Sequence, residues 1–242
     1  MARTRLERMV FVTDTHGDMI DPSAEKAFLD FCKVWKPDVR IHGGDFMDLR
    51  ALRQGAGDED KAEGVKADIE RGVAFIREAG IQRLIWGNHD YRMNRAVKIG
   101  CGRLREYAIM MLNNAILDPI GEKVEHIPYG KRKTLRWHDT TMIHGYHAGI
   151  YAARQAAMTY GPGKVIMGHI HAQSQFAMPS LNPCEGHSVA CLCDLDMDYA
   201  IAHANTLRQS HGWLYGVADN AGHTTLWHAS KIGDKWILPS EF

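Results

Sequence analysis

The sequence has few cysteines, no net charge and no long hydrophobic run, and each absence excludes a class of protein. Five cysteines among 242 residues are too few and too unevenly spaced for a disulfide framework, and an odd number suits a reducing compartment. Lys plus Arg and Asp plus Glu both total 29. This balance argues against a chain-wide field for nucleic acid or acidic membranes, although local patches stay open.

Membrane and targeting segments are also missing from the pattern. No stretch approaches the roughly 20 apolar residues that a spanning helix needs. The basic start is followed by an apolar run over residues 9–12 only, which is too short for a secretory signal. We therefore expect a cytoplasmic protein that does not associate with membranes.

Linkers, low-complexity tracts and internal repeats are absent as well, so we expect one domain over residues 1–242. Short apolar runs alternate with stretches of helical periodicity, which favours an α/β fold. Helices are expected from the N-cap Asp21 to Lys36, and over 65–80, 92–116 and 148–160. The segment 92–116 is basic and is a candidate lid. The expected strands are 9–13, 39–42, 81–86, 140–143 and 164–167, and strand-like runs then cover 173–178, 187–195, 212–217, 223–229 and 235–238, around a short helix at 196–205.

Polar clusters follow five of these strands. In open α/β sheets, ligands bind at the carboxyl ends of strands, so the five clusters can converge on one site. Their side chains offer carboxylate and amide oxygens and imidazole nitrogens, without a thiolate, a set that suits Mn, Fe, Zn or Ni. They are too many for one ion, whereas two ions about 3.5–4 Å apart with a bridging carboxylate would use them all. The clusters are Asp14-Thr15-His16, Gly44-Asp45, Gly87-Asn88-His89-Asp90, His144-Gly145 and Gly168-His169-Ile170-His171.

In this order, over residues 14–171, the clusters resemble the signature of the calcineurin-like metallophosphoesterases. The resemblance implies a four-layer α/β/β/α sandwich of two mixed sheets flanked by helices. It also implies two divalent metal ions, with Mn²⁺ expected first and Fe, Zn, Ni and Mg as alternatives. It implies that Asp45 bridges the ions, that the first is held by Asp14, His16 and His171, and that the second is held by Asn88, His144 and His169.

The same resemblance implies the chemistry. A hydroxide held between two cations attacks phosphorus in line, because the metals lower the pKa of water and neutralise the phosphoryl oxygens. His89 stays unligated and donates a proton to the leaving oxygen. Asp48 matches the carboxylate that orients this histidine in some members of the family. The expected enzyme is a metal-dependent phosphoric ester hydrolase.

Two departures from the Ser/Thr phosphatase branch favour a phosphodiesterase, with nucleases among the candidates. In that branch an Arg follows the second Asp; here Leu49 and then Arg50 follow Asp48, so this arrangement is shifted or absent. Asp90 stands where that branch has Glu. The chain also resembles small phosphoesterases of phages and prophages, through Cys191-Leu192-Cys193, Tyr199 and Gly212-Trp213. The rivals are a phosphomonoesterase acting on a protein or a small molecule, and a non-catalytic scaffold that keeps the fold.

Several side chains could contact a substrate or a further metal, and each has a plainer interpretation. Tyr91 and Arg92 follow the third cluster and could bind substrate, or lie in an ordinary loop. Two basic clusters could contact DNA or RNA, or form a solvated helix face and a charged hairpin tip; they are Arg92, Arg95, Lys98, Arg103 and Arg105, and Lys131, Arg132, Lys133 and Arg136. A zinc cluster of Cys184, His187, Cys191 and Cys193 is less expected than buried thiols that pack on a strand. The oligomeric state is left open.

Overall fold

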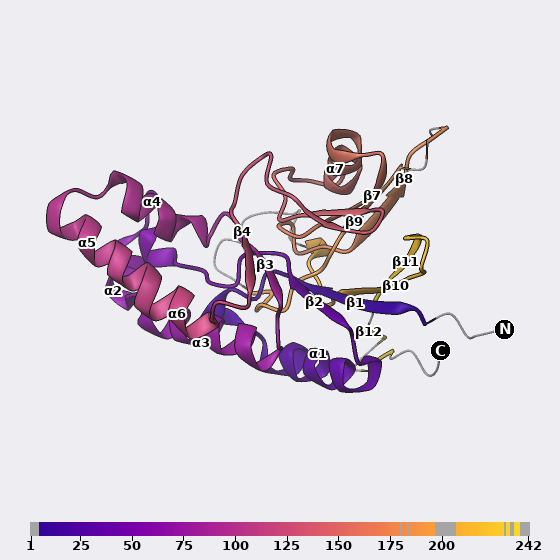
Figure 1. The fold of residues 1–242 in the computed structure, drawn as a ribbon. Helices are drawn as coiled ribbons and strands as arrows, with labels where there is room; N and C mark the ends of the chain where they lie inside the picture. Colours follow the sequence, from indigo (N-terminus) through magenta and orange to yellow (C-terminus); the bar gives the residue numbers. More distant parts are fainter. Residues whose placement is uncertain are drawn as a thin grey trace.

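Two β-sheets lie face to face between two layers of helices (Figure 1). The structure is a computed structural model that describes residues 5–179, 181–182, 184–196, 207–229, 231–232 and 235–237. The first sheet has the strand order β11-β10-β1-β2-β3-β4, and the second has the order β5-β6-β7-β9-β8. Both sheets mix parallel and antiparallel pairs, as the fold class expected from the sequence requires.

Four strands of the first sheet run parallel, and two C-terminal strands extend it in antiparallel fashion beyond β1. The parallel strands are β1 (Glu7–Val12), β2 (Val39–His42), β3 (Arg83–Ile85) and β4 (Glu125–Ile127), and the antiparallel ones are β10 (Leu214–Ala218) and β11 (Thr224–His228). The second sheet contains β5 (Leu135–Trp137), β6 (Thr140–Ile143), β7 (Gly163–Met167), β8 (Ser174–Ala177) and β9 (Cys184–Ser188). A separate pair is formed by β12 (Lys231–Ile232) and β13 (Lys235–Trp236).

Helices cover the outer face of each sheet. α1 (Pro22–Trp35) and α3 (Lys66–Glu78) lie under the first sheet, and α7 (Ala152–Tyr160) lies over the second (Figure 1). α1 begins where the sequence predicts, because the Asp21 carboxylate accepts a hydrogen bond from the Ala24 N–H at 2.8 Å and Pro22 occupies the first helical turn. The short helix α2 is Asp58–Glu63, and the basic segment forms α4 (Tyr91–Ile99), α5 (Gly102–Met110), a π-helix (Met111–Leu117) and α6 (Asp118–Ile120).

The alternation of side chains along β1 separates two layers of core. Val10 and Val12 pack with α1, α3 and the buried Trp213, whereas Met9 and Phe11 pack against the second sheet. This follows from the two-residue period of a strand, which sends neighbouring side chains to opposite faces. Burial of each such side chain contributes about 1.5–3 kcal/mol to folding. A third cluster joins α7 to β6 and β7. The core therefore has three parts: one between the first sheet and α1 and α3, one between the two sheets, and one between the second sheet and α7.

Several sequence-based boundaries were wrong. The run 187–195 is a strand only to Ser188; residues 189–195 leave the second sheet and pass beside the first, where Cys193 forms an isolated bridge with Ile20. β4 and β5 were not expected, and residues 131–133 lie between them, in the crossover from one sheet to the other rather than at a hairpin tip. Apart from Asp196, the short helix expected at 196–205 lies outside the described residues.

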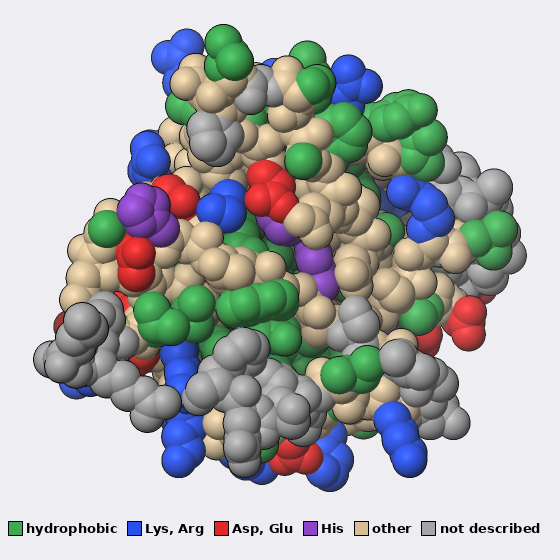
Figure 2. Space-filling model, turned by 90° about the vertical axis from the view of Figure 1, so that its right-hand side faces the viewer, with side chains coloured by type: hydrophobic (Ala, Val, Ile, Leu, Met, Phe, Trp, Pro, Cys, Tyr) green, Lys and Arg blue, Asp and Glu red, His purple; other side chains and the backbone are tan. Residues whose placement is uncertain are grey.

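Basic and acidic side chains are interspersed on the face of the molecule where β8, β11 and β12 lie. Figure 2 shows Lys and Arg side chains on this face scattered among acidic and apolar ones, without a continuous basic area over the described residues. Among the helices of the described ranges, none is long and apolar enough to cross a membrane.

Candidate active site

The five polar clusters lie together where the carboxyl ends of β1, β2, β3, β6 and β7 meet. Backbone hydrogen bonds fix the loops to one another: the Asp14 N–H donates to the Gly44 carbonyl at 2.9 Å, and the Gly168 N–H donates to the His144 carbonyl at 2.9 Å. The first bond joins two loops of the first sheet, and the second joins two loops of the second. The convergence expected from the order of strands and clusters is therefore present.

The first group contains Asp14, His16 and His171, and its donor atoms face one another. His16 Nε2 and His171 Nε2 are 3.1 Å apart, and Asp14 Oδ1 lies 3.3 Å from His171 Nε2. His16 donates its Nδ1–H to the Asp48 carboxylate at 3.0 Å, which leaves a lone pair on Nε2. Asp14 Oδ1 is buried without a hydrogen-bond partner. Lone pairs that converge in a buried space are stabilised by a cation between them.

The second group contains Asp45, Asn88, His144 and His169. His144 donates its Nδ1–H to the Gly43 carbonyl at 3.0 Å. Its Nε2 faces two acceptors, Asn88 Oδ1 at 2.9 Å and Asp45 Oδ2 at 3.1 Å. Donor atoms held by a transition metal at about 2.0–2.2 Å lie roughly 3 Å from one another, so this spacing fits a cation. Asp45, His144 and His169 form one group with metal-binding spacing, and Asp14, His16 and Asp45 form another, so Asp45 belongs to both halves of the site.

The electrostatics of the metal-free site show how it is balanced. Burial acts to raise the pKa of Asp45, but the charges of His144 and His89 hold it well below its usual range. Burial lowers the pKa of His144 and the Asp45 charge raises it, with a net value of about 9. Burial and the charge of His144 lower the pKa of His169 to about 4.

Asp48 connects the site to His89. The His89 Nδ1–H donates to the Asp48 carboxylate at 2.5 Å, and the same oxygen accepts from His16. Burial raises the pKa of Asp48, but the hydrogen bonds from His16 and His89 lower it below the usual range. Arg92 donates to the Asp48 carbonyl at 2.6 Å and lies 3.3 Å from His89 Nε2. One carboxylate thus fixes a histidine of the first group and the histidine expected to act as the acid.

The backbone at the site is strained. Of the eight non-glycine residues with positive φ among the described residues, five belong to the clusters expected to bind metal: Asp14, His16, Asp45, His169 and His171. Such residues cost about 1–3 kcal/mol each and persist where the surrounding structure determines them. Glycines permit the close approach of the loops. A Cβ at Gly87 would lie 2.0 Å from Asp45 Oδ1, and one at Gly168 would lie 2.5 Å from Asp14 Oδ2.

Two buried carboxylates that hold these loops were not assigned a role from the sequence. Asp90 accepts hydrogen bonds from the N–H groups of Asp45, Met47 and Gly87 at 2.8, 3.0 and 2.7 Å. Asp68, on α3, accepts from the Asp48 and Leu49 N–H groups at 2.9 and 2.5 Å. For Asp68, the only signal in the sequence was its place on the apolar side of a predicted helix, and an Asp in that place can equally lie at the edge of the helix face.

The residues expected to bind substrate lie at different distances from the site. Arg92 touches Asp48 and His89, as described. Tyr91 accepts a hydrogen bond from Lys98 at 2.8 Å, and its ring is 5.8 Å from that of Tyr129, which lies 6.0 Å from the ring of His144. Arg50, the shifted arginine, forms a bidentate ion pair with Asp18 and stands 3.9 Å from Asp48 Oδ2.

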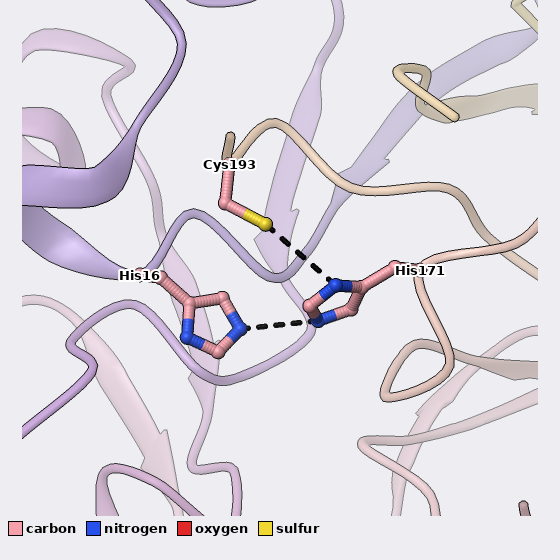
Figure 3. A group of neighbouring side chains, drawn as sticks. All are labelled: His16, His171 and Cys193. Atoms are coloured by element: carbon pink, nitrogen blue, oxygen red, sulfur yellow. Dashed lines mark hydrogen bonds between the residues drawn. The ribbon is translucent and has the colours of Figure 1, made fainter. Parts of the chain in front are cut away.

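The thiols do not form the zinc cluster considered from the sequence. Cys184 is near the Ala157 carbonyl, His187 contacts His228, and within the described ranges no group of metal-binding spacing unites them with Cys191 and Cys193. The expectation that Cys191 and Cys193 lie on a strand was wrong, because both follow β9. The site is also not free of sulfur: Cys193 Sγ is 3.7 Å from His171 Nδ1 (Figure 3).

Facing carboxylate, amide and imidazole donors between two mixed sheets define a metal-dependent hydrolase of the α/β/β/α class. Residues 7–173 match the family model of the calcineurin-like phosphoesterases, so the chain belongs to this family. Its members are metal-dependent phosphoric ester hydrolases that use a dinuclear metal centre, and the His and Asp groups of this site fit such a centre.

The chain is also similar to two phage proteins and, at low identity, to solved structures. The chain is 29% identical over 182 residues to the Gene 54 protein of Mycobacterium phage D29, which covers 69% of this chain and 70% of the relative. It is 28% identical to the Gene 54 protein of Mycobacterium phage L5 with the same coverage. A metallophosphoesterase from Sphaerobacter thermophilus has 12% identity, with a TM-score of 0.47 over 93% of this chain and 89% of that one. A D62A mutant of Vps29 from Entamoeba histolytica has 6% identity and a TM-score of 0.42 over 91% of this chain and 97% of that one.

Proposed function

We propose that this protein is a phosphodiesterase that requires two divalent cations, with Mn²⁺ preferred. The observation that carries the proposal is the set of oxygen and nitrogen donors that face one another at the site, above all the buried Asp14 Oδ1 beside His171 Nε2. We assign the first cation to Asp14, His16, Asp45 and His171, and the second to Asp45, Asn88, His144 and His169. This donor set is oxygen and imidazole nitrogen, which suits Mn²⁺. When bound, the cations supply an activated water at neutral pH and neutralise charge on the phosphoryl oxygens.

The protein's own residues complete the reaction. Asp48 holds His89 through Nδ1, so that Nε2 faces the site beside Arg92. In its protonated form His89 donates this proton to the leaving oxygen. Arg92, whose charge is balanced by the Asp48 carboxylate, offers a hydrogen-bond donor next to the transferred phosphoryl group. The histidine side chain is 17% exposed, which allows a leaving group to reach it from solvent.

Charge balance supports a diester over a monoester. Arg50 is already paired with Asp18, and Arg92 lies within 3.8 Å of the Asp48 carboxylate. A monoester carries up to two negative charges and would need a cationic side chain that is not already neutralised, whereas a diester carries one. A nucleic-acid substrate is one form of this proposal, because α4 and α5 carry Arg95, Lys98, Arg103 and Arg105.

A comparison of two chromogenic substrates tests the proposal. We expect the Mn²⁺-loaded protein to hydrolyse bis-(p-nitrophenyl) phosphate faster than p-nitrophenyl phosphate, and Asp45→Ala to abolish both activities. A preference for the monoester would favour a phosphomonoesterase. The complete absence of hydrolysis across a panel that includes DNA, RNA and cyclic nucleotides, with Mn²⁺, Ni²⁺, Zn²⁺ or Mg²⁺, would favour a non-catalytic scaffold.

His89 provides a second, internal test. p-Nitrophenolate is a good leaving group that needs no proton, whereas an alkoxide leaves only when protonated. His89→Ala should therefore slow a dinucleotide by at least tenfold more than bis-(p-nitrophenyl) phosphate. An equal loss on both substrates would remove His89 from the role of acid. A nuclease would additionally lose DNA binding steeply with rising salt.

A further inference from the structure

The two ring nitrogens of His171 face two different environments. Nε2 points toward His16 Nε2 at 3.1 Å and Asp14 Oδ1 at 3.3 Å, which is the direction of the first cation. Nδ1 points away from it, toward Cys193 Sγ at 3.7 Å. Figure 3 shows the His16 ring and the Cys193 sulfur approaching the imidazole from neighbouring directions, each next to a different ring nitrogen. Cys193 therefore contacts the ring nitrogen of His171 that does not face Asp14, and its sulfur also lies within 4.8 Å of a ring nitrogen of His16.

The backbone around Cys193 is tied to the loop that follows β1. Cys193 forms an isolated antiparallel bridge with Ile20, the Asp194 N–H donates to the Met19 carbonyl at 2.8 Å, and the Leu192 N–H donates to the Asp14 carbonyl at 3.2 Å. The position of the sulfur is consequently fixed relative to Asp14 and His16. The segment that carries Cys193 and the loop that carries two of the assigned ligands are thus joined by backbone hydrogen bonds.

The environment of this sulfur is closed. Cys191 and Cys193 are fully buried, and Cys191 also interacts with His171 while lying 3.5 Å from the Ser210 carbonyl. Gln209 approaches Nδ1 as well, at 3.5 Å, from a less buried position. A metal-binding histidine usually donates its second N–H to a carboxylate, a carbonyl or water, and this bond fixes the ring and raises its basicity. Here sulfur occupies that place.

We propose that Cys193 is a positioning residue for the first cation: its sulfur accepts the Nδ1–H of His171, fixes the ring, and so sets how tightly Nε2 binds the metal. This inference rests on the proposed function, since it assigns His171 to the first cation. His16, His171 and Cys193 also have the spacing of a metal-binding group, but the sulfur faces Nδ1 of His171 and not the Nε2 that faces Asp14. We therefore assign the thiol to the imidazole and not to the cation.

Metal affinity tests the proposal directly. Calorimetric titration of Mn²⁺ into the metal-free protein should resolve two sites. In Cys193→Ala we expect one of the two dissociation constants to rise 10- to 100-fold, the effect usual for removing an outer partner of a metal-binding histidine, and the other to stay unchanged. Cys193→Ser should recover part of the loss, because a hydroxyl also accepts the hydrogen bond.

Matched variants separate positioning from packing. Cys32 is another buried thiol, on α1 and away from the site, and Cys32→Ala should leave both dissociation constants unchanged. If Mn²⁺ affinity fell in Gln209→Ala but not in Cys193→Ala, the proposal would be overturned, and the amide of Gln209 would be the positioning group. The thermal midpoints of the metal-free variants should fall similarly for Cys32→Ala and Cys193→Ala, since both lose one buried sulfur.

The Co²⁺-loaded protein distinguishes the remaining outcomes. We expect ligand-field bands that shift in Cys193→Ala without a sulfur-to-cobalt charge-transfer band in the wild type. Such a band would mean that the thiolate binds the metal, and would overturn the positioning role. Wild-type affinity in Cys193→Ala would refute this inference alone, whereas a wild type that binds neither Mn²⁺ nor Co²⁺ would refute the proposed function together with it.

Discussion

Asp48→Asn should weaken two functions at once, because one carboxylate oxygen holds two histidines. Asp48 Oδ1 accepts from His89 at 2.5 Å and from His16 at 3.0 Å, and the side chain is only 10% exposed. An asparagine can still place its carbonyl oxygen near both N–H groups, but it carries no charge. The variant therefore removes the charge of the acceptor while keeping its shape.

The size of the effect follows from the two bonds. A hydrogen bond to a charged group contributes about 1.5–3 kcal/mol, and a neutral one about 0.5–1.5 kcal/mol, so each bond loses roughly 1–2 kcal/mol. This corresponds to about 5- to 30-fold. The loss at His89 should appear in kcat for a dinucleotide, because that bond supports proton donation. The loss at His16 should appear as a higher Mn²⁺ concentration for half-maximal activity.

The assay measures kcat against Mn²⁺ concentration for the wild type and the variant. Asp18→Asn is the control: Asp18 is a carboxylate near the site that pairs with Arg50 and contacts neither histidine, so both quantities should stay within twofold. If Asp48→Asn is folded and matches the wild type in kcat and Mn²⁺ dependence, the assignment of Asp48 as the common support is wrong. If the variant changed the Mn²⁺ dependence but not kcat, the proposed support of His89 by Asp48 would be wrong and the support of His16 would stand.

Three further predictions follow from the same region. Gly87→Ala places a Cβ 2.0 Å from Asp45 Oδ1 and should lower Mn²⁺-dependent hydrolysis at least tenfold. Gly57→Ala, whose Cβ would meet only Asp60 Oδ2 at 4.0 Å, should not; equal activities of the two variants would contradict the close approach at Gly87. His144, with a pKa of about 9 in the metal-free protein, must lose its proton to bind metal. Titration with Mn²⁺ at pH 8 should therefore release protons, which calorimetry in buffers of different ionisation enthalpy should detect. If no protons are released, the proton is not on His144. Burial raises the pKa of Asp68 to about 6, so the folded state holds this proton more tightly than the unfolded state, and the free energy of unfolding falls as pH rises from about 4 to 6. In urea unfolding of the metal-free protein, the difference in unfolding free energy between the wild type and Asp68→Asn should change in favour of the variant across this window. A change in favour of the wild type would refute the assignment.

The sequence revealed the ends of the strands that carry the site, because each apolar run stops at a polar cluster. That pattern was enough to bring Asp14, Asp45 and Asn88 together, since the carboxyl ends of neighbouring parallel strands share an edge. His144 follows β6 of the second sheet, and the packing of the two sheets brings it to them. The connection of Asp48 with His89 came from the resemblance to the family and not from this pattern. The second contact of Asp48, with His16, was not foreseen, because it depends on how two loops from different strands cross.

Other features had no local signal. β4 and β5 contain three residues each, too few for a two-residue period to stand out. The path of residues 189–195 depends on bridges to Ile20 and His211, which periodicity does not encode, so the run was extended as a strand. The contact between Cys193 and His171 is a consequence of that path and could not be found before it.

The pairing of β1 with β10 has a consequence for synthesis. β1 is synthesised first, but one of its edges pairs with β10, from the last part of the chain. The Asp14 carbonyl likewise accepts its hydrogen bond from the Leu192 N–H, which is synthesised much later. Until then, the growing polypeptide presents an apolar strand with unpaired backbone groups, which is a template for aggregation. We therefore expect slow translation or a chaperone to matter more for the yield of active enzyme than the supply of metal does.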